Sequence, residues 1–106
     1  MSKVIHVDSD EEFDKILNAN ASKLVVIDFF ATWCGPCKKI APEFEKISMK
    51  YDAVFLKVDV DILSKAAEKH SVKAMPTFIC IKDGKKVGEV VGASIDKVEE
   101  MIKANQ

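Results

Sequence analysis

The hydrophobic positions of this 106-residue chain alternate between short apolar runs and stretches with a helical period. The apolar runs are bounded by polar and turn-forming residues, which is typical of strands. Asp83-Gly84 is a hairpin signal, so the residues that follow it should return as an antiparallel partner of the strand before it. The pattern therefore predicts strands over residues 4–7, 24–31, 54–60, 77–82 and 86–91.

Between these runs, apolar residues recur at intervals of three and four, which predicts amphipathic helices. Serine caps indicate where the first and last helices begin, at Ser9 and Ser94. The second helix begins around a pair of cysteines and contains Pro42, which should kink it. The third helix should run from Ile62 to about His70.

The predicted order is β-α-β-α-β-α-β-β-α. Strands that alternate with helices pair in parallel, whereas the final hairpin must be antiparallel. We therefore expect an α/β fold, with a five-stranded mixed sheet flanked by four helices on both faces. A chain of this length, 48% apolar and 31% charged, has room for one core. We expect a single domain over residues 1–106.

Charge and composition exclude several classes of partner. The net charge is −1, and all 16 basic residues are lysine, so the chain lacks the arginine forks that recognise phosphate and guanine. We expect no nucleic acid and no membrane as a partner, because no segment approaches the roughly 20 apolar residues that cross a bilayer. The N-terminus matches neither a secretory signal nor a transit peptide. These features favour a cytoplasmic location, and a nuclear pool is compatible with them.

Two of the three cysteines, Cys34 and Cys37, stand two residues apart at the predicted junction of a strand and a helix. In a reducing compartment such a pair favours dithiol–disulfide chemistry or a metal site over a structural disulfide. A zinc site would need two more ligands from Cys80, His6 or His70, and no second paired motif supplies them. We expect no metal. Cys80 lies mid-strand and should be a buried core residue, whereas both histidines should lie at the surface or at strand ends.

The two thiols should differ in role. Cys34 is at the start of a helix, where unpaired N–H groups stabilise a thiolate, so it should be the exposed nucleophile. Cys37, one turn further along, should be more buried and should resolve the mixed disulfide. Asp28 is the one charge in an eight-residue apolar run, and burial should raise its pKa and suit it to act as a base. Lys57, a charge in the neighbouring apolar strand, is expected to pair with Asp28 and is placed with it among the catalytic residues. Alternatively, the two form only a structural ion pair.

The chain resembles the thioredoxin family over essentially its whole length. The resemblance rests on Trp33-Cys34-Gly35-Pro36-Cys37, on Asp28, on Met75-Pro76-Thr77, and on Gly84 and Gly92. It implies a thioredoxin fold and a general protein-disulfide reductase with no bound cofactor. It also implies re-reduction of a Cys34–Cys37 disulfide by a thioredoxin reductase, ultimately from NADPH. Expected clients are oxidised proteins such as ribonucleotide reductase and peroxiredoxins, and the chain is expected to be a monomer.

The resemblance also implies a cis peptide before Pro76 that turns the Met75 backbone toward Cys34, where a client chain could add as a strand. The expected docking surface is apolar and nearly uncharged. It comprises Trp33, Gly35, Pro36, Met75, Pro76, Val91, Gly92 and Ala93.

Two other functions are consistent with the paired cysteines. One is a binding subunit of the same fold that holds a partner without turnover, which two intact cysteines disfavour. The other is a disulfide oxidase or isomerase. Relatives with those roles usually have histidine between the cysteines, so Gly35-Pro36 favours the reductase.

Overall fold

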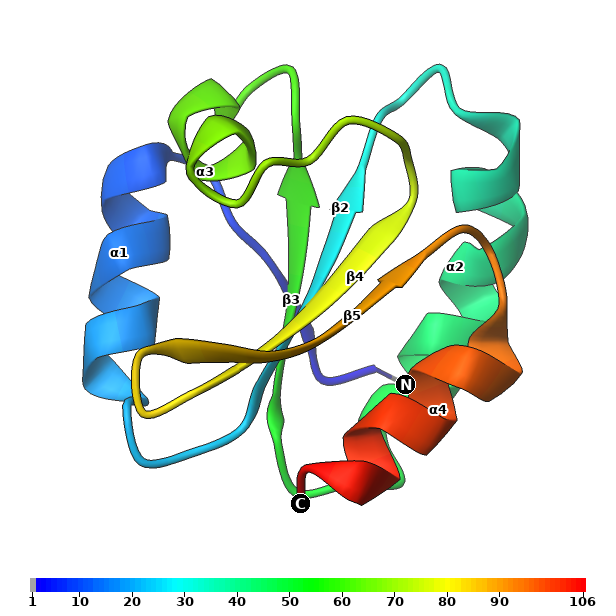
Figure 1. Cartoon of the computed structure of the whole chain (residues 1–106). Coiled ribbons are helices and arrows are strands. Elements are labelled where there is room, and N and C mark those ends of the chain that lie inside the picture. Colours follow the sequence, from blue (N-terminus) through cyan, green and yellow to red (C-terminus); the bar gives the residue numbers. More distant parts are fainter. Residues whose placement is uncertain (1) are drawn as a thin grey trace.

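The structure is a computed structural model that describes residues 2–106. Five strands form one mixed sheet in the order β1-β3-β2-β4-β5, and four helices connect or follow them (Figure 1). The elements, in chain order, are β1 Val4–His6, α1 Asp10–Ala19, β2 Val25–Phe30, α2 Gly35–Ser48, β3 Val54–Asp59, α3 Ser64–Lys69, β4 Thr77–Lys82, β5 Lys85–Val91 and α4 Ile95–Ala104. This is the fold that the hydrophobic pattern predicts.

The strand pairing follows from the connections. β3 pairs in parallel with both β1 and β2, as strands joined through helices do. β4 is antiparallel to β2, and β5 is antiparallel to β4. The β4–β5 turn places Asp83 at φ 54° and Gly84 at φ 74°, the two positive φ values that a two-residue type I′ hairpin requires. β2 lies at the centre and is buried along almost all of its length.

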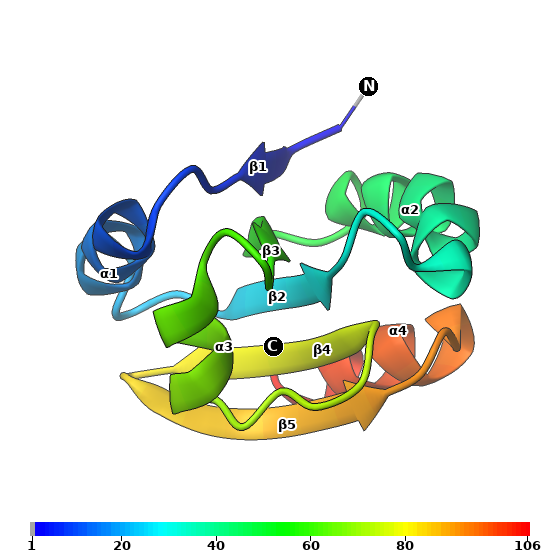
Figure 2. The same cartoon turned by 90° about the horizontal axis from the view of Figure 1, so that it is seen from above.

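Helices cover the two faces of the sheet in pairs. Figures 1 and 2 show α1 and α3 on one side and α2 and α4 on the other. Phe13 and Leu63 pack on the first face, against alternate residues of β2, β3 and β4. Phe44 and Ile102 pack on the second face, against the intervening residues of the same strands. Apolar side chains on both sides explain why the central strands are continuous hydrophobic runs.

The start of one helix differs from the sequence-based expectation. α3 begins at Ser64 rather than Ile62, because the backbone first turns back on β3: the amides of Ile62 and Leu63 donate to the Asp59 carbonyl. Ile62 is 64% exposed in that turn, so its apolar character does not mark a helix. α2 runs continuously from Gly35 to Ser48 with Pro42 inside it.

His70 is a further correction, since it is not a simple surface residue. Its ring packs against Phe13 and Phe29, with centroids 5.9 Å away in each case, and its Nε2 is buried without a hydrogen-bond partner. Burial, followed by the charges of Lys69 and Lys86, lowers the pKa of His70. The neutral ring therefore serves as part of the apolar packing between α1 and the sheet.

Cys80 is fully buried in the cluster beneath α2 and α4, and burial raises the pKa of its thiol to about 12. The expectation of a core cysteine is confirmed. In residues 2–106, no helix has both the length and the apolar character needed to cross a membrane.

Candidate active site

Four chain segments meet at one edge of the sheet. The carboxyl ends of the parallel strands β2 and β3 lie at this edge, and they lead into Trp33 and Asp61 respectively. Because β4 is antiparallel to β2, its beginning at Thr77 lies at the same edge, together with the end of β5 at Val91. Residues distant in sequence are thereby brought around the cysteine pair.

Cys34 and Cys37 form a disulfide. Cys34 is the N-cap of α2, with extended backbone angles, and its Sγ accepts a hydrogen bond from the Cys37 backbone N–H at 3.2 Å. Gly35 and Pro36 fill the first two helical positions, where the missing N–H of proline leaves no bond unmade. The sulfur of Cys34 thus lies where unpaired N–H groups and the helix dipole stabilise negative charge.

The exposure of the two cysteines differs less than the sequence predicts. Cys34 is 6% exposed and Cys37 is 2% exposed, so Cys34 is not an exposed residue in the disulfide form. Ala31 packs beside both, and Met75 covers them from the facing loop. What separates the two sulfurs is therefore their position relative to the helix start, rather than their access to solvent.

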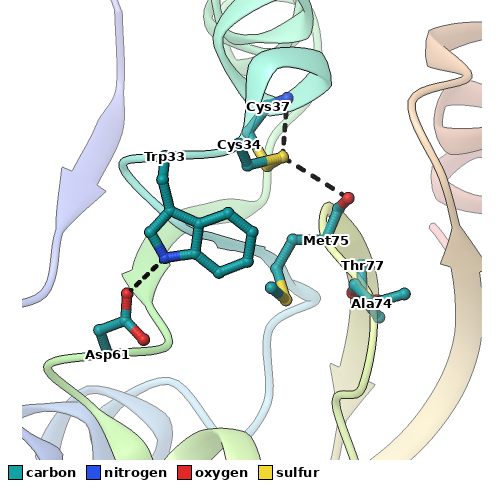
Figure 3. The surroundings of a disulfide bond; sticks show 7 residues. All are labelled: Trp33, Cys34, Cys37, Asp61, Ala74, Met75 and Thr77. Carbon is teal, nitrogen blue, oxygen red and sulfur yellow. Dashed lines mark hydrogen bonds between the residues drawn. A yellow bond between two sulfur atoms is a disulfide. The ribbon is translucent and has the colours of Figure 1, made fainter.

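The loop before β4 faces the disulfide. The Met75–Pro76 peptide is cis, as the resemblance implies. The Met75 carbonyl oxygen lies 3.6 Å from Cys34 Sγ (Figure 3). In the dithiol form, the Cys34 thiol can donate a hydrogen bond to this oxygen. Pro76 itself is buried, whereas the Met75 side chain is half-buried.

Trp33 lies over this site and is 67% exposed. Its indole Nε1 donates a hydrogen bond to Asp61 Oδ2 at 2.9 Å (Figure 3). Sequence reasoning did not include Asp61. A signal was nonetheless present, because an acidic residue that follows a parallel strand lies at the edge where the neighbouring strand delivers the cysteines.

Two further hydrogen bonds hold the Met75 loop. Thr77 Oγ1 donates to the Ala74 carbonyl at 2.6 Å, and the Gly92 N–H donates to the Pro76 carbonyl at 2.9 Å. Gly92 has φ 107°, a conformation that favours glycine. The sequence contained Thr77 in the quoted motif but gave no indication of this bond, which depends on how the loop closes.

Asp28 and Lys57 are neighbours in register across β2 and β3, on the face that carries α2. Asp28 is fully buried, and neither carboxylate oxygen has a hydrogen-bond partner. Burial raises the pKa of Asp28 to about 7, while the charge of Lys57 opposes the rise. Lys57 Nζ lies 4.6 Å from the centre of the Phe30 ring, so the expected direct ion pair does not form.

Surface pockets surround the disulfide. One, of about 480 Å³, adjoins Trp33 and Met75 and is lined by residues of α3 and the loop after it. A second, of about 390 Å³, is lined by Gly35, Pro36 and Ala93 with part of α2. A third, of about 200 Å³, reaches both Cys37 and Lys57. The docking residues predicted from the sequence therefore line two sides of the site, with Val91 60% exposed beside them.

Within residues 2–106, no three His, Cys, Asp or Glu side chains are grouped in a way that could hold a metal ion. Cys80 is buried in the core cluster under α2 and α4, and His70 packs against Phe13 on the opposite face. The residues that a zinc site would need are thus on different sides of the sheet.

The Thioredoxin family model matches residues 4–104. Thioredoxin-1 of Schizosaccharomyces pombe is 54% identical over 103 residues, which cover 96% of this chain and 98% of the relative. Thioredoxin of Callithrix jacchus is 51% identical over 100 residues, covering 93% and 95%. A crystal structure of reduced Schistosoma mansoni thioredoxin is 59% identical, with a TM-score of 0.94 and coverage of 97% and 98%. A Nicotiana alata thioredoxin is 44% identical, with a TM-score of 0.96 and coverage of 99% and 94%.

A dithiol–disulfide pair at the start of a helix, facing a cis-proline loop, defines a thiol–disulfide oxidoreductase. The chain belongs to the thioredoxin family and is a protein-disulfide reductase. Neither a binding subunit without turnover nor an oxidase or isomerase is favoured. Thioredoxins carry no prosthetic group, and NADPH with a reductase is the usual source of their electrons. The family also implies a reductase and disulfide-containing clients as partners.

Proposed function

We propose that Cys34 is the attacking thiol of this reductase. The single observation that carries the proposal is that Cys34 Sγ, and not Cys37 Sγ, caps α2. A thiolate there accepts the Cys37 N–H and is stabilised by the positive end of the helix. The Cys34 thiolate attacks one sulfur of a client disulfide, a Cys34–client disulfide forms, and the second client sulfur leaves as a thiolate that takes up a proton.

Cys37 then resolves this intermediate. Its thiolate attacks Cys34 Sγ, the bond from Cys34 to the client breaks, and the client sulfur that Cys34 had bound leaves as a thiolate. Two electrons have passed to the client, and the Cys34–Cys37 disulfide remains. A reductase that draws on NADPH returns two electrons to this pair. No group other than the two sulfurs carries the electrons.

Asp28 is proposed as the base that receives the Cys37 proton. A carboxyl with a pKa of about 7 exists in both protonation states at neutral pH, which suits a group that accepts and returns a proton. The pocket of about 200 Å³ that reaches Cys37 is also lined by Lys57, the register neighbour of Asp28, and it has room for waters that could relay the proton toward the carboxyl. In this proposal Lys57 is a charge that keeps the pKa of Asp28 from rising further.

The proposed client site is the Met75 backbone with the apolar residues beside it. Met75 lies in the loop before β4, outside the paired residues of the sheet, so an extended client chain can pair with its backbone as an added strand. Trp33, Gly35, Pro36 and Ala93 are exposed around it, Gly92 is half-buried beside them, and Pro76, which the sequence placed on this surface, is buried in the loop. A largely uncharged surface of this kind suits clients of varied sequence.

A trapping experiment tests the division of roles. Cys37→Ser should accumulate a covalent adduct with an oxidised client, detected as an intact mass shift, whereas Cys34→Ser should form none. Cys80→Ala serves as the control, since its buried thiol takes no part. An adduct on Cys34→Ser but not on Cys37→Ser would reverse the assignment.

We also propose a domain organisation, clients, a location and an oligomeric state for the chain. Residues 1–106 are proposed to form one domain, which a family match over residues 4–104 supports. Ribonucleotide reductase and peroxiredoxins are the proposed clients, and the proposed location is cytoplasmic. We propose a monomer, which sedimentation can check against the chain mass of 11.8 kDa. Client capture by Cys37→Ser in a cytosolic extract, followed by mass spectrometry, tests the choice of clients.

A further inference from the structure

The hydroxyl of Thr77 has a specific partner in the loop that faces the disulfide. Thr77 is the first residue of β4 and is 3% exposed. Its Oγ1 donates a hydrogen bond of 2.6 Å to the carbonyl of Ala74, three residues earlier. This bond closes the loop around Met75 and Pro76.

The three successive carbonyls of the loop have different surroundings. The Ala74 carbonyl accepts from Thr77, and the Pro76 carbonyl accepts from the Gly92 N–H. The middle carbonyl, that of Met75, points to the disulfide and lies 3.6 Å from Cys34 Sγ. Hydrogen bonds therefore fix the Ala74–Met75 and Pro76–Thr77 peptide groups, which lie on either side of the Met75–Pro76 peptide.

Peptide geometry links the Thr77 hydroxyl to the Met75 N–H. The Ala74 carbonyl and the Met75 N–H belong to the same planar peptide group, and in a trans peptide they point in opposite directions. A hydrogen bond that turns the Ala74 carbonyl toward Thr77 therefore directs the Met75 N–H away from the loop. Pro76 has no N–H of its own, so the Met75 N–H and C=O are the pair of groups that a client chain can use here.

We propose that Thr77 is a positioning residue for client binding, because its hydroxyl orients the Ala74–Met75 peptide so that Met75 can pair with the client backbone. The inference rests on the proposed function, in which the client adds as a strand at Met75. Thr77 acts through Met75 and touches neither the client nor the sulfurs. Its role is in productive client binding rather than in the exchange of electrons.

Loss of the hydroxyl should leave the fold intact. Ala74 is exposed, so its carbonyl can bond to water when Thr77 is replaced, and no buried acceptor is left unpaired. Thr77→Val keeps the β-branched shape that suits the start of a strand. The peptide then loses its fixed orientation, while the packing around it stays.

The test compares two synthetic clients. Each is a symmetric dimer of a short peptide joined through its single cysteine, and the second carries an N-methyl group on the amide beside that cysteine. The methyl group removes a backbone donor without changing the disulfide. Steady-state reduction with excess NADPH and reductase gives kcat and KM for both dimers, and reduction of a small disulfide without peptide bonds provides a reference.

For the wild type, we expect a higher KM for the methylated dimer. Thr77→Val should raise the KM for the unmethylated dimer about 3- to 10-fold, the effect of one hydrogen bond, with kcat changed less than twofold. The rate at which Thr77→Val reduces the small disulfide should fall by a smaller factor. Thr77→Ser, which keeps the hydroxyl, should restore the KM, and Thr77→Ala should behave as Thr77→Val does.

Ser48→Ala is the matched control. Ser48 is also fully buried and donates its hydroxyl hydrogen bond to the carbonyl of Glu45, three residues earlier, at the far end of α2. It should lower stability without changing the ratio of the two KM values.

The outcomes separate the inference from the proposed function. If the wild type reduces both dimers with the same KM, client pairing at Met75 is itself wrong. If the ratio of the two KM values is the same for Thr77→Val as for the wild type, and differs from one, the client pairs with Met75 but Thr77 has no positioning role. If kcat/KM of Thr77→Val falls equally for the peptide dimer and for the small disulfide, the inference is also overturned, because the variant then has general damage to the site.

Discussion

Asp28 and Lys57 are direct neighbours across strands β2 and β3, yet their charged groups do not hydrogen-bond. The Lys57 ammonium lies over the Phe30 ring, and the Asp28 carboxyl stays fully buried with no partner. A buried carboxyl that lacks donors is more stable when protonated. This arrangement provides a proton acceptor near neutral pH within a strand that is otherwise apolar, and two predictions depend on it.

The first concerns stability and pH. Burial raises the pKa of Asp28 from 3.8 to about 7, so the folded protein keeps a proton that the unfolded chain releases. The free energy of unfolding should therefore fall as pH rises from about 4 to about 7, and level off above that range. A shift of this size corresponds to about 4 kcal/mol. Asp28→Asn should remove this dependence and gain stability relative to the wild type at pH 8, but not at pH 4.

Urea denaturation of the oxidised wild type and of Asp28→Asn at pH 4, 6 and 8 measures this effect. The informative quantity is the difference between the two proteins at each pH, since other carboxylates titrate equally in both. A difference that stays constant from pH 4 to pH 8 would contradict the raised pKa of Asp28.

The second prediction concerns the resolving step. Without the Asp28 carboxylate, Cys37 loses its proposed proton acceptor, so Asp28→Asn should slow release of the client by about 100-fold, a usual effect of removing a general base. The first attack by Cys34 should change much less. Acid quenching of single turnovers followed by mass spectrometry should show the Cys34–client adduct accumulating. Release at the wild-type rate would mean that Asp28 is not the base.

A third prediction uses Trp33, which is the one tryptophan of the chain, so that its fluorescence reports on it alone. Its indole is held by Asp61 at 2.9 Å. Asp61→Ala should free the indole, lower its fluorescence anisotropy and increase quenching by acrylamide. The value of kcat/KM for a protein client should fall about 3- to 10-fold, as expected for the loss of one solvent-exposed hydrogen bond.

Asp61→Asn is the control for this effect, because the amide oxygen can still accept the indole N–H without the charge. Anisotropy close to that of the wild type is expected for this variant. If Asp61→Ala leaves the anisotropy unchanged, other contacts of Trp33 hold the ring, and the hydrogen bond does not.

A fourth prediction concerns Cys80. The reduced protein has three cysteines, but Cys80 is fully buried and burial raises the pKa of its thiol to about 12. A thiol reagent at neutral pH should therefore label Cys34 first, and Cys80 only after unfolding. Cys80→Ala should keep reductase activity, at a cost of about 1 kcal/mol for the lost packing. Rapid labelling of Cys80 in the native protein would show that the core opens locally.

The order and type of the elements follow from the amino-acid sequence. Apolar runs and helical periods are local properties, so they placed all five strands and four helices to within a few residues. The pattern of Cys34, Gly35, Pro36 and Cys37 at a strand–helix junction also determined the chemistry of the site. The largest error in an element, the early start given to α3, arose because Ile62 is apolar and yet exposed in a turn.

Only the tertiary structure determined how the chain around the sulfurs is oriented. The contacts of Met75 with Cys34, of Thr77 with Ala74 and of Trp33 with Asp61 depend on strand order and loop closure. Strand order is set by the packing of whole helices and strands, which a local sequence pattern does not describe. Whether a hydrogen bond forms depends on shifts of less than an ångström in the positions of its two atoms. For the same reason, the sequence could place Lys57 beside Asp28 but could not show that its ammonium lies over Phe30.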